Sequence, residues 1–163
     1  MINKAMPRKI VSVFLVILII ICGGIFAKKF FFEYFGFCKG DYTVVYESNS
    51  HGGINGDGHY CFVLDCSNNK EKALKTVKNW KSLPLTDNLE SLVYGEFRYN
   101  SSSISEMAHI PEIKNGYYKF LDRYPKYIHI GSDSDFLNRG AYNFSIAIYD
   151  SDTDRMYYFE LDT

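Results

Sequence analysis

The sequence predicts an α+β protein in which an N-terminal transmembrane helix precedes a mainly antiparallel β-sheet domain with one amphipathic helix packed on a face. Three observations support this fold class: an uncharged apolar run near the N-terminus, several Tyr- and Phe-rich segments that alternate apolar and polar residues, and one segment with helical periodicity. We divide the chain into a basic flank, an apolar span, an aromatic connector and one folded domain, at residues 1–9, 10–27, 28–40 and 41–163.

The apolar span runs from Ile10 to Ala27 and holds 18 residues without a charge. As a helix it is about 27 Å long, close to the hydrocarbon core of a bilayer at about 30 Å. The alternatives are a cleaved signal peptide and lipid modification at Cys22. The run exceeds a signal core, and bulky Ile25 and Ile21 stand where those two signals carry small residues. We therefore expect an uncleaved single-pass anchor in the cell membrane.

The charges beside the span predict its orientation. Lys4, Arg8 and Lys9 precede it, whereas Lys28 and Lys29 follow it. Because basic residues gather on the cytoplasmic side, this small excess favours a cytoplasmic N-terminus. The C-terminal domain is then extracytoplasmic.

Composition limits what the domain binds. Three of the 18 basic residues precede the span, so 15 remain against 19 acidic ones and the rest of the chain carries a net charge of −4. This balance argues against nucleic acid, which is bound through basic patches. Aromatic residues make up 17% of the chain, far more than disordered segments carry. We therefore expect one folded domain with a single core.

Two hairpins are expected. Asp41–Ser48 and His59–Cys66 alternate apolar and polar residues as half-buried strands do. The segment between them, His51 to Gly58, holds four glycines in eight residues, with Asn-Gly and Asp-Gly turn pairs. Near the C-terminus, Tyr142–Tyr149 and Met156–Leu161 form a second hairpin. Short strands are also expected at Tyr117–Leu121, at Tyr127–Ile130 and around Glu96 to Tyr99.

One segment changes to the helical period. Lys70–Lys81 is an amphipathic helix in which Asn68 and Glu71 make a capping pair and four residues face inward: Ala73, Leu74, Val77 and Trp80. It has to end before Pro84. A shorter helix follows from Asp87, capped by Asp87 with Glu90, to Gly95. The Lys70–Lys81 helix is the one we expect across a face of the sheet.

Three cysteines lie beyond the span, at Cys38, Cys61 and Cys66. In an oxidising compartment we expect one disulfide and one free thiol. Cys61 and Cys66 are five residues apart, so on one strand they point to opposite faces and do not bond each other easily. The expected pair is Cys38 with Cys61 or Cys66, and three reduced thiols are the alternative.

The glycine-rich loop is the first candidate for ligand or partner contact, through His51, Gly52, Gly53, Asp57 and His59. Imidazole and carboxylate groups suit metals, and glycines let the backbone approach a ligand. The loop matches no known metal-ligand spacing, and it leads into a strand instead of the helix N-terminus that phosphate loops use. We therefore predict no metal and no cofactor, and a mobile hairpin tip is the alternative interpretation.

Two other patterns fail as chemical sites. Asp150, Asp152 and Asp154 open like a calcium loop, but Arg155 stands at the sixth position where that loop needs Gly. Cysteine catalysis needs a thiolate beside a histidine, and the nearest pair, Cys61 with His59, lacks a recognisable third group or oxyanion donor. We therefore assign no catalytic residue.

A set of short motifs lies between about Glu47 and Gly95. They are His51-Gly52-Gly53, Gly56-Asp57-Gly58, Leu64-Asp65-Cys66-Ser67, Trp80-Lys81 and Leu83-Pro84-Leu85. In these motifs the chain resembles small uncharacterised, membrane-anchored proteins of Firmicutes-type bacteria. That resemblance implies a bacterial envelope setting and transfers no catalytic residue.

Two classes of function follow from these observations. The first is a membrane-anchored binding or interaction module, whose loop contacts an envelope protein or a small ligand. The alternative is a metal-dependent or cysteine-dependent hydrolase built around His51, Asp57, His59 and Cys61. The anchor, the aromatic β-rich domain and the lack of a recognisable catalytic motif favour the binding module.

Overall fold

The computed structural model describes residues 34–52, 56–95, 102–124, 133, 136–138 and 140–163. The chain divides into two compact units, Met1–Phe37 and Cys38–Thr163, and the second unit holds all the strands described below. The predicted span at residues 10–27 lies outside the described residues, as do the strands predicted at 96–99 and 127–130. Among the residues that are described, no helix has the length and apolar character needed to cross a bilayer.

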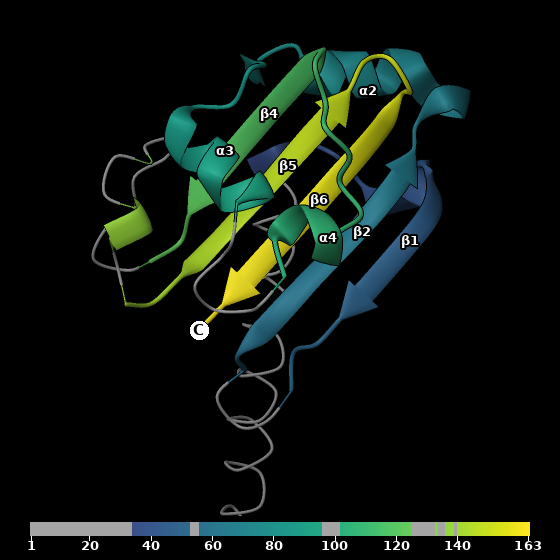
Figure 1. The fold of residues 1–163 in the computed structure, drawn as a ribbon. Coiled ribbons are helices and arrows are strands. Elements are labelled where there is room, and N and C mark those ends of the chain that lie inside the picture. The colour runs from purple at the N-terminus through teal and green to yellow at the C-terminus, as the bar shows by residue number, and fades with distance from the viewer. Residues whose placement is uncertain (1–33, 53–55, 96–101, 125–132, 134–135, 139) are drawn as a thin grey trace, which may run out of the picture. The chain divides into compact units, whose positions relative to one another are not determined.

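Six strands form one antiparallel sheet in the order β1-β2-β6-β5-β4-β3 (Figure 1). This sheet and the two hairpins, β1 with β2 and β5 with β6, confirm the predicted α+β class. The strands are β1 (Thr43–Asn49), β2 (Gly58–Asp65), β3 (Lys81–Ser82), β4 (Gly116–Asp122), β5 (Asn143–Asp150) and β6 (Arg155–Asp162).

The last strand, β6, lies at the centre of the sheet between β2 and β5. It can occupy this place because its side chains are apolar on both faces: Tyr157 and Phe159 are buried on one face, and Met156 and Tyr158 on the other. At its end, Asp162 is paired with the first residue of β2 and the first residue of β5. This register brings the end of the chain beside the β1–β2 loop.

Two short helices, α3 (Asp87–Tyr94) and α4 (Ile104–Met107), cover one face of the sheet (Figure 1). The N-cap of α3 is Thr86 and not the predicted Asp87, because the Thr86 hydroxyl accepts a hydrogen bond from the backbone N–H of Leu89. α4 was not predicted, although a capping box of Ser103 with Glu106 marks its start. The core under these helices includes Cys61, Val63, Leu89, Leu92, Val93, Ile104, Phe120, Phe136, Phe144, Ile146, Tyr157 and Phe159.

The predicted Lys70–Lys81 helix is wrong in its length. The observed helix, α2 (Lys70–Val77), lies at one end of the sheet, and α3 and α4 cover the core face (Figure 1). It ends early because Lys81–Ser82 is extended as β3 and pairs with β4. Of the four residues expected to face inward, three are buried, Ala73, Val77 and Trp80, whereas Leu74 is 38% exposed.

The start of α2 also differs from the prediction. The N-cap is Asn69, which makes no side-chain capping hydrogen bond, so the expected pair of Asn68 with Glu71 does not form. A single turn of 3-10 helix at Ser67–Asn69 leads into α2 in its place. Two further single turns lie at Lys39–Asp41 and Phe136–Asn138.

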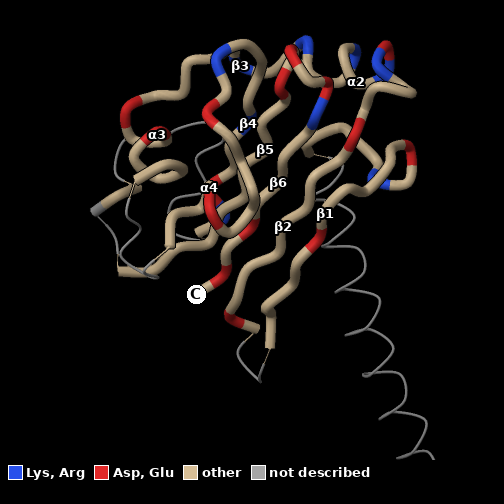
Figure 2. Tube along the Cα trace, turned by 45° about the vertical axis from the view of Figure 1, so that its right-hand side comes forward, with Lys and Arg blue, Asp and Glu red and all other residues tan. Residues whose placement is uncertain are grey.

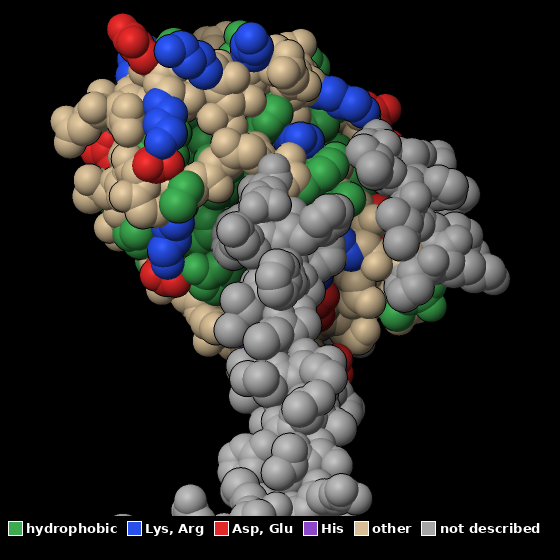
Figure 3. All heavy atoms as spheres, turned by 180° about the vertical axis from the view of Figure 1, so that it is seen from behind, with side chains coloured by type: hydrophobic (Ala, Val, Ile, Leu, Met, Phe, Trp, Pro, Cys, Tyr) green, Lys and Arg blue, Asp and Glu red, His purple; other side chains and the backbone are tan. Residues whose placement is uncertain are grey.

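The second face of the sheet also carries aromatic residues. The rings of Phe62 in β2 and Tyr158 in β6 stack with their centroids 4.8 Å apart. The Lys39 ammonium lies 5.7 Å from the Phe62 ring centre, and its nitrogen is 2.6 Å from a carboxylate oxygen of Glu47. Figure 3 shows apolar side chains gathered on this side of the molecule. Aromatic contacts on both faces thus fix β2 and β6 against each other.

Candidate functional site

The β1–β2 loop folds back over the end of the sheet. Its ends continue the antiparallel pairing, since the Ser50 N–H donates to the His59 carbonyl at 2.8 Å and the Gly52 N–H donates to the Asp57 carbonyl at 3.4 Å. Gly58 has φ of +148°, and a Cβ there would lie 2.6 Å from the His51 Cα. Only glycine permits this close approach, which places His51 beside the first residue of β2.

His51 is oriented by its neighbour Asn49. One oxygen, Asn49 Oδ1, accepts the backbone N–H of His51 at 3.0 Å and lies 3.1 Å from the ring nitrogen Nδ1. The other ring nitrogen, Nε2, lies 3.2 Å from Oδ2 of Asp162. The ring therefore bridges the loop and the end of β6, with Nε2 directed at the strand.

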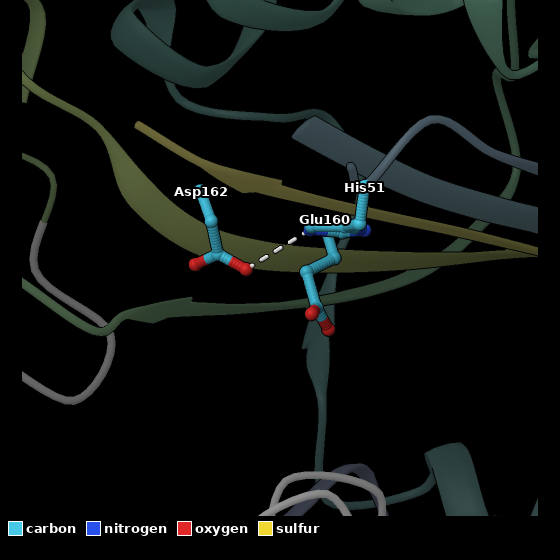
Figure 4. Close-up of side chains that lie close together, drawn as sticks. All are labelled: His51, Glu160 and Asp162. Atoms are coloured by element: carbon cyan, nitrogen blue, oxygen red, sulfur yellow. Dashed lines mark hydrogen bonds and ion pairs between the residues drawn. The ribbon is translucent and has the colours of Figure 1, made fainter. Parts of the chain in front are cut away.

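Three side chains meet at this point, and we call His51, Glu160 and Asp162 the His51 cluster. One donor atom from each lies within 4.8 Å of the others, and among the described residues no other group of three potential metal ligands is this close. Glu160 and Asp162 alternate on β6, so they share a face of the sheet. Figure 4 shows the imidazole joined to Asp162, with Glu160 beside them. All three side chains are half-buried, so the cluster is accessible from solvent.

Arg123 and Tyr158 hold the two carboxylates. Nη1 of Arg123 lies 3.0 Å from Oδ1 of Asp162, and Nη2 lies 3.8 Å from Oε1 of Glu160. The guanidinium is itself fixed, because Nη2 donates to the Phe144 carbonyl at 3.0 Å. The Tyr158 hydroxyl donates to Oε2 of Glu160 at 2.6 Å, and burial, followed by the nearby Glu160 charge, raises the pKa of Tyr158 well above its usual value. The carboxylates are thus held in place by a donor on β6 itself, Tyr158, and by Arg123, which follows β4.

Charge differs between the two ends of the sheet. Figure 2 shows acidic segments where the chain ends and near the β1–β2 loop, whereas basic and acidic residues lie together around α2 at the other end. The two carboxylates of the His51 cluster face the guanidinium of Arg123, so with a neutral imidazole the cluster and Arg123 together have a net charge of −1. The end that carries the cluster therefore favours cationic or hydrogen-bond-donating ligands.

The other predicted contact residues lie apart from the cluster. His59 stacks on Phe159 with ring centroids 5.7 Å apart, and its Nδ1 lies 2.8 Å from the Ser50 hydroxyl. Burial, and then the nearby His51, lower the pKa of His59. Asp57 and Gly52 are exposed in the loop, and Gly53 lies outside the described residues. The structure thus joins His51 to β6 and does not join it to Asp57 and His59 as one ligand set.

The cysteines are free thiols among the described residues, so the predicted bond of Cys38 with Cys61 or Cys66 is not formed in this structure. Cys38 is exposed, whereas burial raises the pKa of Cys61 to about 11 and that of Cys66 to about 12. The Cys61 thiol lies under α4, where it donates to the Met107 carbonyl at 3.6 Å. A neutral, buried thiol is a poor nucleophile, which argues against the cysteine-dependent hydrolase.

An open polar cavity of about 240 Å³ lies near the opposite end of β2. Its acidic groups already have partners, since Asp41 pairs with Lys72 at 2.7 Å and Asp65 accepts the Ser67 N–H at 2.9 Å. The His51 cluster is therefore the better candidate site. The cavity is lined by Gly40, Asp41, Tyr42, Thr43, Asp65, Asn68 and Asn69.

Sequence reasoning found His51 and missed its partners Glu160, Asp162 and Arg123. One signal was available, because two acids two residues apart in an apolar strand must share a face, where only a polar environment tolerates them. Comparisons of the chain with protein-family models, with curated proteins and with solved structures found no match. The function proposed below therefore rests on the residues described above.

Proposed function

We propose that this protein is a membrane-anchored binding module whose domain faces outward from the cell membrane and holds an envelope protein or a small ligand at the His51 cluster. The observation that carries the proposal is the contact of His51 in the β1–β2 loop with Asp162 at the end of β6, with Glu160 within 4.8 Å. Half-exposed polar side chains on a rigid sheet, next to a surface loop, are the usual construction of a binding site.

The support beneath the cluster favours recognition of a ligand. β6 is hydrogen-bonded to strands on both sides, and Arg123 and Tyr158 fix the carboxylate oxygens of Asp162 and Glu160. Groups that are held in position before binding lose little side-chain entropy when a ligand arrives. The acidic character of the cluster favours a partner with a cationic or hydrogen-bond-donating group.

The outward placement is supported by the apolar span at residues 10–27 and by the basic residues before it. Cys38 is the natural reporter because it is exposed, whereas Cys61 and Cys66 are buried. Intact cells that carry the Cys22→Ser variant are treated with a membrane-impermeant thiol reagent. Labelling of Cys38 before lysis supports the proposal, and labelling only after lysis contradicts it.

The binding role is tested by photo-crosslinking in the same cells. A photoreactive amino acid replaces exposed Asp57 in the loop and, as the matched control, exposed Lys75 on α2 at the other end of the sheet. The proposal predicts a discrete adduct from the loop position and none from α2. Equal adducts from both positions, or none from either, would refute a binding role for this end of the sheet.

A further inference from the structure

We propose that the His51 cluster is a binding site for a divalent transition-metal ion, which links the β1–β2 loop to the end of β6. This inference rests on the proposed function in one respect, because it names the ligand class for the same surface. The metal itself would be held by this chain alone, so its binding can be measured without any partner.

The hydrogen bonds of His51 favour a positive charge, either a proton or a metal ion, between the ring and Asp162. Asn49 Oδ1 accepts the backbone N–H of His51, which identifies it as the amide oxygen and therefore as an acceptor only. Nδ1 lies 3.1 Å from that oxygen, so Nδ1 carries the hydrogen of the ring. In the neutral ring Nε2 then carries a lone pair and no hydrogen, yet it faces a carboxylate oxygen of Asp162 at 3.2 Å. Two acceptors in this position repel each other unless a proton or a metal ion lies between them.

The distances suit a metal ion. Two ligand atoms that are each about 2.1 Å from Zn²⁺ lie about 3.0–3.4 Å apart, depending on the coordination geometry. The separation of 3.2 Å between Nε2 of His51 and Oδ2 of Asp162 falls within this range. Glu160 supplies the third donor, which lies within 4.8 Å of both.

The surroundings of the donors resemble those of known metal ligands. A ligating histidine usually gives its second N–H to an oxygen acceptor, as Nδ1 of His51 does to Asn49. Arg123 contacts Oδ1 of Asp162, so its opposite oxygen, Oδ2, is left for the ion. Arg123 also reduces the negative charge of the cluster. One imidazole with two carboxylates suits Zn²⁺, Mn²⁺, Fe²⁺ or Ni²⁺.

A metal in this place would keep open coordination positions. Three donors come from the chain, and a tetrahedral or octahedral ion takes one or more further ligands. Because the cluster is half-exposed, a donor from a partner or a small ligand can reach these positions. This arrangement gives the proposed binding module a chemical means of holding its ligand.

The test uses the full-length, untagged, metal-stripped protein in detergent and titrates it with Zn²⁺ and with Mn²⁺ in a calorimeter. We expect one ion per chain, with affinity at least tenfold weaker in His51→Ala and in Asp162→Asn. The control is His109→Asn, because His109 is exposed, lies outside the cluster and has a φ of +54° that asparagine tolerates. Its affinity should equal that of the wild type.

Two outcomes would overturn the proposal. In the first, the wild type binds no ion, and the contact is then an imidazolium–carboxylate ion pair alone. In the second, His51→Ala binds the ion as tightly as the wild type. Asp162→Asn also removes a partner of Arg123, so circular dichroism checks its fold. His51 lies in a surface loop, and its variant keeps the test valid if the Asp162 variant fails to fold. A protein that binds metal but gives no loop adduct in cells would retain this site and lose the proposed partner role.

Discussion

Gly116 begins β4 at a position where any larger residue meets the backbone of β5. Its φ is +157°, and a Cβ added there would lie 1.9 Å from the Tyr149 carbonyl oxygen and 3.0 Å from the carbonyl carbon. The Gly116 carbonyl in turn accepts the N–H of Leu83 at 3.0 Å, beside β3. Gly116→Ala therefore forces β4 and β5 apart where three strands meet.

The expected loss follows from these contacts. Over-packing of this kind costs about 1–3 kcal/mol, and an unfavourable backbone conformation for a non-glycine residue costs about 1–3 kcal/mol. Together they lower the free energy of unfolding by about 2–6 kcal/mol. In a domain of this size the melting temperature then falls by roughly 10 °C or more.

Urea unfolding, followed by the fluorescence of Trp80, measures this loss. Trp80 is the single tryptophan and is buried, so its emission reports unfolding of the domain. The control is Gly140→Ala, because a Cβ at Gly140 has nothing within 4 Å, and we expect a change within about 0.5 kcal/mol. If Gly116→Ala is as stable as the wild type, or if both variants lose equal stability, the described contact of β4 with β5 is wrong.

Three further predictions concern thiols, a helix cap and a carboxylate. At pH 8 iodoacetamide should modify Cys38 in the folded protein and spare Cys61 and Cys66. Burial raises the pKa of Cys61 to about 11 and that of Cys66 to about 12. Equal modification of the three cysteines, measured by peptide mass mapping, would contradict this prediction. Ser103→Ala removes the capping box of α4 and should lower the free energy of unfolding by about 0.5–2 kcal/mol in urea. Hydrogen bonds from Lys70 and then Tyr149 lower the pKa of Asp154. The stability that this carboxylate contributes is therefore fully present above the unfolded-state pKa of about 3.9, and it is lost as the pH falls through the folded-state pKa. Asp154→Asn should therefore be less stable than the wild type at pH 6, with a gap that narrows below pH 4; a gap independent of pH would refute the ion pair.

The strands could be predicted from sequence because their signal is local. Alternation of apolar and polar residues located β1 and β2, and glycines between them located the loop. Aromatic and β-branched residues located β5 and β6, although these strands are buried on both faces and alternate less. Each observed boundary of these strands lies within two residues of the expected one, whereas α2 ends at Val77, four residues before the predicted Lys81.

The choice of core helix could not be predicted from periodicity. Lys70–Lys81 shows the clearer apolar stripe, yet α3 and α4 provide the residues that cover the sheet. Leu89, Leu92 and Val93 make a shorter stripe that tertiary packing completes. Local pattern indicates that a helix has an apolar side and leaves open which part of the sheet it covers.

The partners of His51 depend on contacts between distant parts of the chain. His51 and Asp162 are 111 residues apart and meet only because β6 inserts between β2 and β5. No local pattern encodes this strand order, since either hairpin could have paired through its other edge. The acidic pair on β6 has a local signal, but its place beside His51 was beyond sequence reasoning, even though the histidine was identified.

The most direct test of the cation site is nitrogen-15 NMR of the His51 ring in the full-length protein, with His51→Ala to assign the signals. We predict that Nδ1 carries the hydrogen in the metal-free protein and that Zn²⁺ shifts the Nε2 resonance of His51 while the rings of His59 and His109 are unchanged. A hydrogen on Nε2 in the neutral ring, with no change on addition of Zn²⁺, would contradict both the tautomer and the metal site.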